Sequence, residues 1–290
     1  MSDVGVIGIG NMGLGMALRL LDRGWSVGVR DIDPAREAAA RAHGATVHAD
    51  AQALARASRW LIVAVVDAAQ TREVLLGADG AAQALPPGAG VLLCPTIAPG
   101  DVEELATVLS ALGHDVVDAP MSGGPLRARD GTMSMMVACA DAVFERCEGL
   151  LGDLSSRLFR VGQRPGDGAR TKLVNNLLAA VNLVGAAEAM ALAQRLGLDP
   201  RSTLDVIEQS SGQSWIGVDR MRRAIEGDAQ VHAHIALLAK DSALALAAAR
   251  ATDWVPAVGA GAAGVFAAAC AEGLEREDDS ALYRWLAQAR

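Results

Sequence analysis

The segment of residues 166–196 most limits how this 290-residue chain can fold. It contains no proline, and its apolar side chains recur at the three-to-four spacing of one helix face. These side chains are Leu173, Leu177, Val181 and Val184. Asp167 or Gly168 can cap the start of the helix, and Gly197 follows its end. About 28 helical residues extend about 42 Å, more than most small domains are wide. We therefore expect one long helix that joins two bodies of the protein.

The amino terminus combines a short apolar run with three closely spaced glycines. A short apolar run, Val4–Ile9, leads into G-I-G-N-M-G at residues 8–13, and a helix is expected over Met12–Arg23. A buried strand, a G-x-G-x-x-G turn and a helix open such domains. The motif alone is weak evidence. Its place after one strand, before a helix and ahead of a second strand at Ser26–Arg30 makes it stronger.

The positions in this turn have different predicted tasks. Gly8 permits the tight turn, Gly10 lets a pyrophosphate approach the backbone, and Gly13 lets helix and strand pack closely. The helix N-terminus, around Asn11 and Met12, offers N–H groups and the positive end of a dipole to phosphate. We therefore predict that these five residues bind the cofactor.

An aspartate at the end of the second strand bears on the choice of cofactor. Asp31 stands close to the expected distance, about 20 residues beyond the glycines, for a carboxylate that binds the adenosine ribose. Such a carboxylate accepts the hydroxyls of NAD and repels the 2′-phosphate of NADP. Arg30 points to the other face of the strand by alternation. A helix cap or a loop acid is the plainer interpretation of Asp31, but we predict NAD, with NADP less favoured.

Strands and helices continue to alternate up to about residue 117. Further strands are expected at Trp60–Val66, Gly90–Leu93 and His114–Val117. Helices are expected at Pro34–Gly44, Ala51–Ala57, Thr71–Leu76 and Asp101–Leu112. This alternation predicts a parallel sheet with both faces buried, in which ligands collect at the carboxyl ends of the strands.

Two of these strand ends carry polar residues. After Gly90–Leu93, the hydroxyl of Thr96 can reach the nicotinamide side, although a turn bounded by Pro95 is an equal alternative. After His114–Val117, Ser122-Gly123-Gly124 exposes consecutive backbone N–H groups, which suit a carboxylate. An ordinary tight loop is the alternative there, because Ser-Gly-Gly is frequent in turns.

The start of the long helix carries three polar residues on one face. Lys172, Asn175 and Asn176 lie three and four residues apart. A lysine with two carboxamides can serve proton transfer and substrate holding. A solvated polar flank of an amphipathic helix is the commoner fate of such residues.

The second half of the sequence reads as helices without a convincing strand. Expected helices are Pro200–Gln209, Asp219–Glu226, His232–Ala251, Pro256–Glu272 and Ser280–Gln288. The predicted fold is therefore an α/β Rossmann-type dinucleotide-binding domain, residues 1–163, followed by an all-α domain, residues 164–290, joined by the long helix. The loop that ends in Ser214 and Trp215 is small and polar, and Trp215 can either shape specificity or simply pack.

Charge and composition exclude several function classes. The net charge is −8 without a long basic run, which argues against nucleic acid and anionic membranes as partners. The uncharged segment 255–271 is too short and too weakly apolar for a membrane span, so we expect a buried helix. The four cysteines show no CxxC spacing, and His232 and His234 lack a third ligand, so no metal site is predicted. The first residues lack the basic start of a signal peptide, which indicates a cytoplasmic location.

Three elements together resemble the β-hydroxyacid dehydrogenase family. They are the amino-terminal glycine pattern, D-A-P-M-S-G-G at residues 118–124, and G-x-x-x-K-x-x-N-N at residues 168–176. They occur in the family's order, and the resemblance covers essentially the whole chain. It implies hydride transfer between a nicotinamide cofactor and a small hydroxy acid or semialdehyde bearing a carboxylate, such as 3-hydroxyisobutyrate, tartronate semialdehyde or threonate.

The resemblance also implies roles for particular residues. It makes Lys172 the catalytic acid/base and Asn175 and Asn176 the residues that hold the substrate. It assigns the substrate carboxylate to the Ser-Gly-Gly loop, residues 122–124. It places Thr96 and Lys240, the latter in an Ala-Lys-Asp sequence, beside the cofactor.

The resulting expectation is an NAD-dependent oxidoreductase that forms a homodimer or homotetramer through its helical half. One alternative is a related enzyme that reduces imines; the lysine and the carboxylate loop speak against it. Another is a dinucleotide-binding protein without catalytic activity, which the lysine and asparagine residues of the long helix disfavour.

Overall fold

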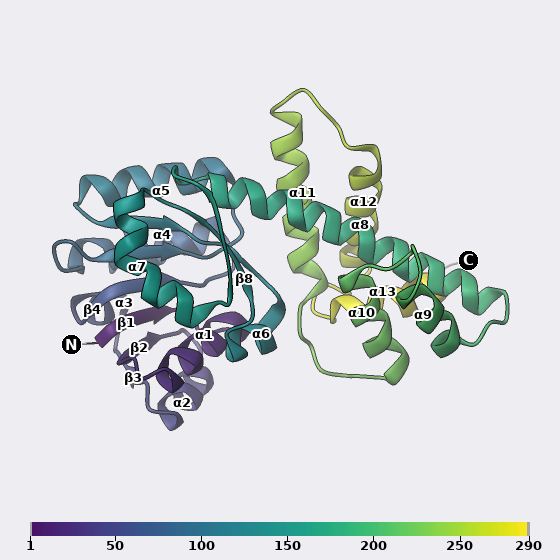
Figure 1. The fold of residues 1–290 in the computed structure, drawn as a ribbon, viewed down its shortest axis with the longest axis horizontal. Helices are drawn as coiled ribbons and strands as arrows, with labels where there is room; N and C mark the ends of the chain where they lie inside the picture. The colour runs from purple at the N-terminus through teal and green to yellow at the C-terminus, as the bar shows by residue number, and fades with distance from the viewer. Residues whose placement is uncertain (1, 289–290) are drawn as a thin grey trace. The chain divides into compact units, whose positions relative to one another are not determined.

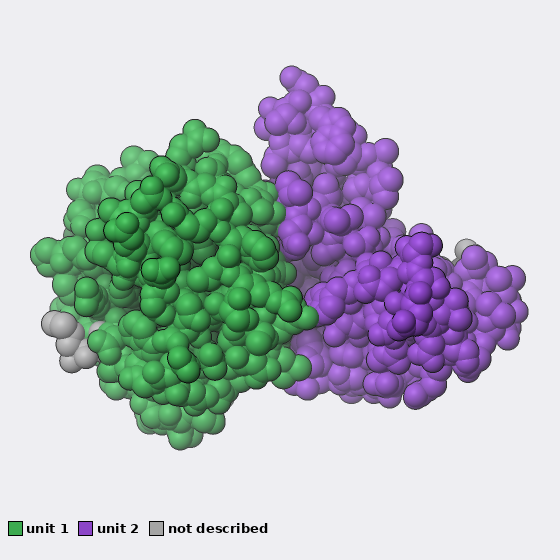
Figure 2. Space-filling model, in the orientation of Figure 1, with its two compact units in different colours: residues 1–172 green, residues 173–290 purple. Residues whose placement is uncertain are grey.

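The computed structural model describes residues 2–288, which divide between two compact units (Figures 1 and 2). The first unit ends at Lys172 and the second begins at Leu173. This division falls inside the long helix α8 (Asp167–Arg195), whereas the boundary predicted after residue 163 lies ahead of that helix. The predicted boundary stays a prediction.

The first unit is built on one nine-stranded sheet. Its strands are β1 (Ser2–Ile7), β2 (Val27–Arg30), β3 (Thr46–Val47), β4 (Ser58–Val63), β5 (Gly90–Leu93), β6 (Asp115–Asp118), β7 (Met121–Ser122), β8 (Ser134–Ala138) and β9 (Arg157–Gly162). The spatial order is β3-β2-β1-β4-β5-β6-β8-β7, and β9 pairs with β8. All pairs from β3 to β6 are parallel, whereas β8 runs antiparallel to β6 and β7. The predicted Rossmann-type sheet is confirmed, with an antiparallel extension that the sequence did not indicate.

Helices cover both faces of this sheet (Figure 1). They are α1 (Asn11–Asp22), α2 (Pro34–Ala42), α3 (Ala51–Arg56), α4 (Ala68–Leu76), α5 (Pro99–Ala111), α6 (Gly124–Asp130) and α7 (Asp141–Leu154), with a 3-10 turn at Ala82–Ala84. Neighbouring strand residues alternate between two apolar cores. Ile62 and Leu92 belong to the core with α1 and α7, and Leu61 and Leu93 belong to the core with α4 and α5.

Two strands end earlier than expected. β1 ends at Ile7 and not at Ile9, because Gly8 has a φ of +84° and already begins the turn. β4 ends at Val63 and not at Val66, because Asp67 caps α4 by accepting a hydrogen bond from the N–H of Gln70. The residues between strand and cap form the connection at the carboxyl end of the sheet.

The second unit is helical throughout its described part, apart from one bridge between His234 and Asp278. It contains the rest of α8, then α9 (Pro200–Glu208), α10 (Trp215–Glu226), α11 (Ile235–Arg250), α12 (Ala257–Ala271), a 3-10 turn at Asp279–Ala281 and α13 (Leu282–Gln288). Its core gathers around Phe266, which is fully buried. The predicted all-helical character is confirmed.

Two predicted helix starts in this unit are wrong by three or more residues. α11 begins at Ile235 and not at His232, because Asp278 accepts hydrogen bonds from the N–H groups of His232 (2.8 Å) and Ala233 (3.1 Å). These bonds hold the preceding residues in an extended segment. α10 begins at Trp215, four residues before the predicted start, because Ser214 caps it through the N–H of Gly217.

Two helices bear on the question of membrane spans. α12 was expected to be buried, but only one of its faces is: Phe266 is fully buried and Val258 is 70% exposed. α8 is long and apolar enough to cross a membrane by length and composition, with a mean hydropathy of 1.5 in its most apolar 18 residues. Of that stretch 44% is buried inside the protein, and the core helix of a soluble protein gives the same result.

Candidate active site

The glycine-rich turn after β1 is tight at two positions and open at the third. Gly8 has a φ of +84°, which favours glycine. A Cβ on Gly13 would lie 1.9 Å from the carbonyl oxygen of Gly8, so only glycine lets α1 approach the turn this closely. A Cβ on Gly10, in contrast, would meet no protein atom within 4 Å. The backbone at Gly10 is therefore open to a group that approaches from outside the chain.

The start of α1 differs from the starts of the next three helices. Asp33, Asp50 and Asp67 cap α2, α3 and α4 by accepting hydrogen bonds from backbone N–H groups. Gly10 stands at the same position before α1 and supplies no side chain. Because the first N–H groups of a helix have no partner within it, the start of α1 suits an anionic group such as a pyrophosphate. The residues present therefore fit a dinucleotide.

Asp31 lies directly beside this turn. Its carboxylate accepts hydrogen bonds from the N–H groups of Ile9 (2.7 Å) and Asp33 (2.9 Å). Arg30 is turned toward Glu37, with 2.7 Å between its Nη1 and the carboxylate. Ile32, directly after Asp31, is 94% exposed.

The two glycines of the Ser-Gly-Gly loop adopt backbone conformations with positive φ. Gly123 and Gly124 have φ values of +129° and +78°, which disfavour any other residue. Ser122 ends β7, and its carbonyl oxygen accepts a hydrogen bond of 3.3 Å from the hydroxyl of Ser134. Thr96 is half-buried in the connection between β5 and α5.

Lys172 and Asn176 are buried, whereas Asn175 is not. Lys172 is 6% and Asn176 is 7% exposed, one turn apart on α8. Asn175 is exposed, although its side-chain amide donates a hydrogen bond of 3.0 Å to the Oδ1 of Asn176. The three polar residues of this face are therefore not equivalent, and Asn176 is the asparagine that is buried like the lysine.

A buried carboxylate in the second unit joins two of the predicted site residues. Asp241 is 6% exposed and accepts a hydrogen bond from the side-chain amide of Asn176 at 2.6 Å. Its other oxygen lies 2.7 Å from the Nζ of Lys240. Asp241 was not among the predicted site residues. Its signal in the sequence is its place directly after Lys240, but the contact with Asn176 joins residues 65 positions apart.

The remaining candidates have structural partners. Ser214 caps α10, and the guanidinium of Arg220 lies 5.7 Å from the ring centroid of Trp215. His232 Nε2 lies 3.0 Å from a carboxylate oxygen of Asp228. Among the described residues no group of three or more His, Cys, Asp or Glu side chains is arranged to hold a metal ion.

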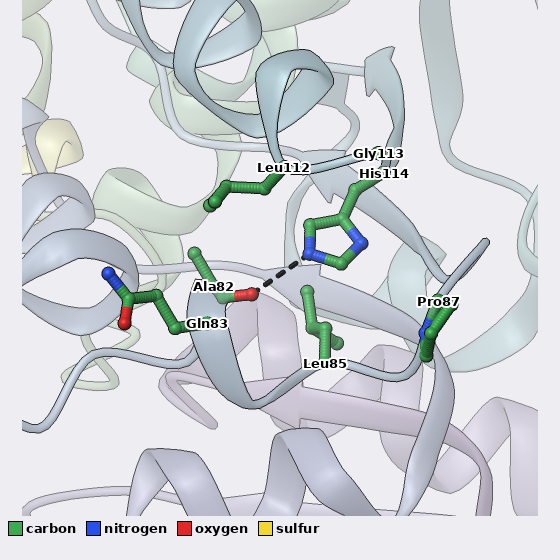
Figure 3. A pocket seen from close by; sticks show the side chains of 7 residues that line it. All are labelled: Ala82, Gln83, Leu85, Pro87, Leu112, Gly113 and His114. Atoms are coloured by element: carbon green, nitrogen blue, oxygen red, sulfur yellow. Dashed lines mark hydrogen bonds between the residues drawn. The ribbon is translucent and has the colours of Figure 1, made fainter.

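The first unit also contains a pocket, whose lining residues are drawn in Figure 3. Its lining comes from the 3-10 turn and from the segment before β6, namely Ala82, Gln83, Leu85, Pro87, Leu112, Gly113 and His114. His114 Nε2 lies 2.9 Å from the carbonyl oxygen of Ala82 (Figure 3). This is the amino end of β6, opposite to the end where Asp118 and the Ser-Gly-Gly loop follow. None of the predicted site residues lines this pocket.

Comparison with known proteins covers nearly the whole chain. Residues 3–162 match the NAD-binding domain of 6-phosphogluconate dehydrogenase, and residues 166–286 match the NAD-binding domain of NADP-dependent 3-hydroxyisobutyrate dehydrogenase. The L-threonate dehydrogenase of Escherichia coli K12 is 36% identical over 97% of this chain and 93% of the relative. The chain belongs to the β-hydroxyacid dehydrogenase family.

Solved structures agree with this assignment. A crystal structure of 3-hydroxyisobutyrate dehydrogenase from Salmonella typhimurium superposes with a TM-score of 0.92 at 35% identity, over 97% of this chain and 99% of that one. An imine reductase from Pseudomonas sp. has a TM-score of 0.69 at 21% identity, over 98% of each chain, which shows a common fold alone. The protein is thus an oxidoreductase of the β-hydroxyacid dehydrogenase family with an NAD(P)-binding domain.

Proposed function

We propose that this β-hydroxyacid dehydrogenase transfers hydride between NAD and a small hydroxy acid that bears a free carboxylate, with Lys172 as general acid/base. The observation that most supports this is the burial of Lys172 on α8, one turn before the buried Asn176. Burying a lysine costs free energy unless its charge is paired, and proton transfer is a role that the chemistry of a buried lysine suits.

The proposed mechanism divides between the chain and its cofactor. The bound nicotinamide supplies the hydride acceptor. Lys172 takes the proton of the substrate hydroxyl in oxidation and returns it to the carbonyl oxygen in reduction. The backbone N–H groups of the loop 122–124 hold the substrate carboxylate, and Asn176 orients the reacting hydroxyl, with Asn175 at the rim. Asp241 fixes the amide of Asn176 through the 2.6 Å hydrogen bond.

A panel of small 2- and 3-hydroxy acids with NAD and NADP tests this proposal, with the absorbance of the reduced cofactor as the readout. L-threonate and 3-hydroxyisobutyrate come first, because the relatives carry these names. We expect turnover with at least one acid and none with the corresponding amide, which lacks the carboxylate. Turnover of a cyclic imine but of no hydroxy acid would support an imine reductase. Tight NAD binding without any turnover would support a non-catalytic protein.

We propose NAD as the preferred cofactor because of Asp31, with Thr96 and Lys240 on the nicotinamide side. Asp31→Ala should narrow the preference for NAD over NADP by about tenfold or more, because like charges placed side by side cost several kcal/mol. Arg36 lies 3.4 Å from the side-chain oxygen of Asn11 and can offer a positive charge to a 2′-phosphate. The gain with NADP should therefore disappear in the double variant Asp31→Ala/Arg36→Ala. A wild-type protein that is more efficient with NADP contradicts this assignment.

We also propose that the protein is at least a dimer through its helical unit, and that it acts in the cytoplasm without nucleic acid or membrane partners. Exposed apolar side chains follow one another where α12 begins: Trp254 (59% exposed), Val255 (60%) and Val258 (70%). Gly259 brings α12 close to α8, since a Cβ there would lie 2.8 Å from a side-chain carbon of Leu177.

Light scattering at micromolar concentration measures the proposed assembly. We expect a mass of at least twice 29.9 kDa. Val258→Asp should shift the mass toward the monomer, because it places a charge in an apolar contact. The matched change Val108→Asp, at a partly exposed valine of the first unit, should leave the mass unchanged. A wild-type mass of 29.9 kDa rejects the dimer.

A further inference from the structure

A buried carboxylate at the end of β6 holds the start of α8. Asp118 is 1% exposed, and its Oδ2 accepts hydrogen bonds from the N–H groups of Gly166 (2.7 Å) and Ala169 (3.1 Å). Its Oδ1 is buried and has no hydrogen-bond partner in the described structure. Burying a carboxylate with one oxygen unpaired costs stability. Such a cost is expected where a residue serves function rather than packing.

Gly168 makes this close approach possible. A Cβ on Gly168 would lie 2.8 Å from both Cγ and Oδ1 of Asp118, and also 2.8 Å from the carbonyl oxygen of Met136 on β8. Any larger residue would push the first turn of α8 away from the sheet. The first glycine of the G-x-x-x-K-x-x-N-N pattern therefore has a steric explanation, because it lets the backbone of the helix reach the carboxylate.

Asp118 differs from the ordinary helix caps of this chain. Asp33, Asp50 and Asp67 each cap a helix that begins at the next residue. Asp118 caps a helix whose contacting residue Gly166 lies 48 positions further on. It also opens the connection that leads to the Ser-Gly-Gly loop, four residues later. The residue that ends β6 thus binds the start of α8 through its carboxylate and continues along the chain into the loop.

We propose that Asp118 is a positioning residue that fixes the first turn of α8, and through it Lys172, relative to the loop that bears residues 122–124. Ala169 lies three residues before Lys172, so its hydrogen bond to Asp118 holds the turn from which the lysine projects. The link to turnover rests on the proposed function. The anchoring of the helix does not.

The pH dependence of stability tests the environment of Asp118 independently of turnover. Burial raises the pKa of Asp118 to about 6, partly offset by the N–H groups of Ala169, Gly166 and Gly168, while the charge of Asp167 raises it further. Cys94 also faces it, and burial together with Asp118 raises the pKa of that thiol. Because the folded-state pKa is above the ordinary value of 3.8, the contribution of Asp118 to stability is present below pH 3.8 and is lost as the pH rises through about 6. Asp118→Asn removes this titration. The melting temperature of the variant should therefore rise relative to that of the wild type between pH 4 and pH 7.

Three variants of the full chain test the positioning role. Asp118→Ala removes both hydrogen bonds and should lower kcat by about 10²-fold, because a small misplacement of a catalytic group has effects of that size. The dissociation constant for NAD should stay within about twofold, since the glycine-rich turn is untouched. Asp118→Asn keeps an acceptor oxygen and should retain most of kcat. Asp115→Asn on the same strand, which loses only the surface ion pair with Arg146, is the matched control and should leave kcat unchanged.

Amide hydrogen exchange tests whether Asp118 anchors the start of α8, and it does not require turnover. In Asp118→Ala, the amides of residues 166–172 should exchange faster by about tenfold or more, while those of β1 and β4 keep their protection. If Asp118→Ala does not fold, Gly168→Ala disturbs the same contact from the other side and should give the same pattern of exchange and the same loss of kcat.

The outcomes separate this inference from the proposed function. If no hydroxy acid is turned over by the wild type, the proposed function fails, and the exchange data alone decide whether Asp118 anchors α8. Unchanged exchange at 166–172 overturns the inference. So does an active wild type whose Asp118→Ala variant keeps its kcat, or an Asp118→Asn variant that loses as much kcat as Asp118→Ala.

Discussion

Replacing Lys172 with alanine should lower turnover of the hydroxy acid by about 10²–10⁴-fold, the usual effect of losing a general acid/base. NAD should still bind with near-normal affinity, because Gly8, Gly10 and Gly13 belong to a separate part of the chain. Turnover is measured at saturating hydroxy acid, and the dissociation constant for NAD is measured by titration. The separation of the two quantities is the signature of a residue that takes part in the chemistry rather than in cofactor binding.

Two further lysine variants sharpen this result. Lys172→Arg should recover little activity, because a guanidinium stays protonated and cannot act as the base. Lys240→Ala is the matched change on α11 and should weaken NAD binding instead, given its proposed place beside the cofactor. Near-normal turnover in Lys172→Ala, with loss only in Lys240→Ala, would reverse the two assignments.

Gly10→Ala should weaken NAD binding and Gly13→Ala should lower stability, although the two residues stand in one turn. A methyl group on Gly10 meets no protein atom within 4 Å, so the variant should fold with an unchanged melting temperature. It should weaken NAD binding by about 10- to 100-fold, because the methyl group stands between the pyrophosphate and the N–H groups of α1. A methyl group on Gly13 would lie 1.9 Å from the carbonyl oxygen of Gly8. That variant should lose about 1–3 kcal/mol of stability or more even without cofactor.

Thermal unfolding with and without NAD separates the two effects. Gly10→Ala should melt like the wild type in the absence of NAD and gain less from its addition. Gly13→Ala should melt lower under both conditions. If Gly10→Ala binds NAD as tightly as the wild type, the pyrophosphate does not pass over this position, and the predicted binding mode is wrong.

The parts of the fold that the sequence predicts well are those set by local patterns. The strand–turn–helix at residues 4–23 has an apolar run, a glycine turn and an apolar helix face within two dozen residues. β5 agrees with its expected bounds, Gly90–Leu93, because a turn with Gly88 precedes it and Pro95 follows it. α8 follows from one uninterrupted periodic pattern, and it runs from Asp167 to Arg195.

The parts that the sequence misses depend on partners far along the chain. β9 (Arg157–Gly162) alternates poorly between apolar and polar residues and becomes a strand by pairing with β8. β3 and β7 have two residues each, too few to show any period. The contacts of Asp118 with α8 and of Asp241 with Asn176 join residues tens of positions apart, so no spacing reveals them. Local spacing placed Asn175 with Lys172, but burial separates it from Lys172 and Asn176.

Gly10, which leaves the start of α1 without a side-chain cap, provides a place where cofactor binding can add to the stability of the folded state. The next three helices carry their own aspartate caps, whereas α1 has no side-chain cap, so an anion can take the place of water at its first N–H groups. A dinucleotide at 100 times its dissociation constant stabilises the folded state by about 2.7 kcal/mol. The resistance of the folded chain to proteases should then rise with the concentration of free dinucleotide.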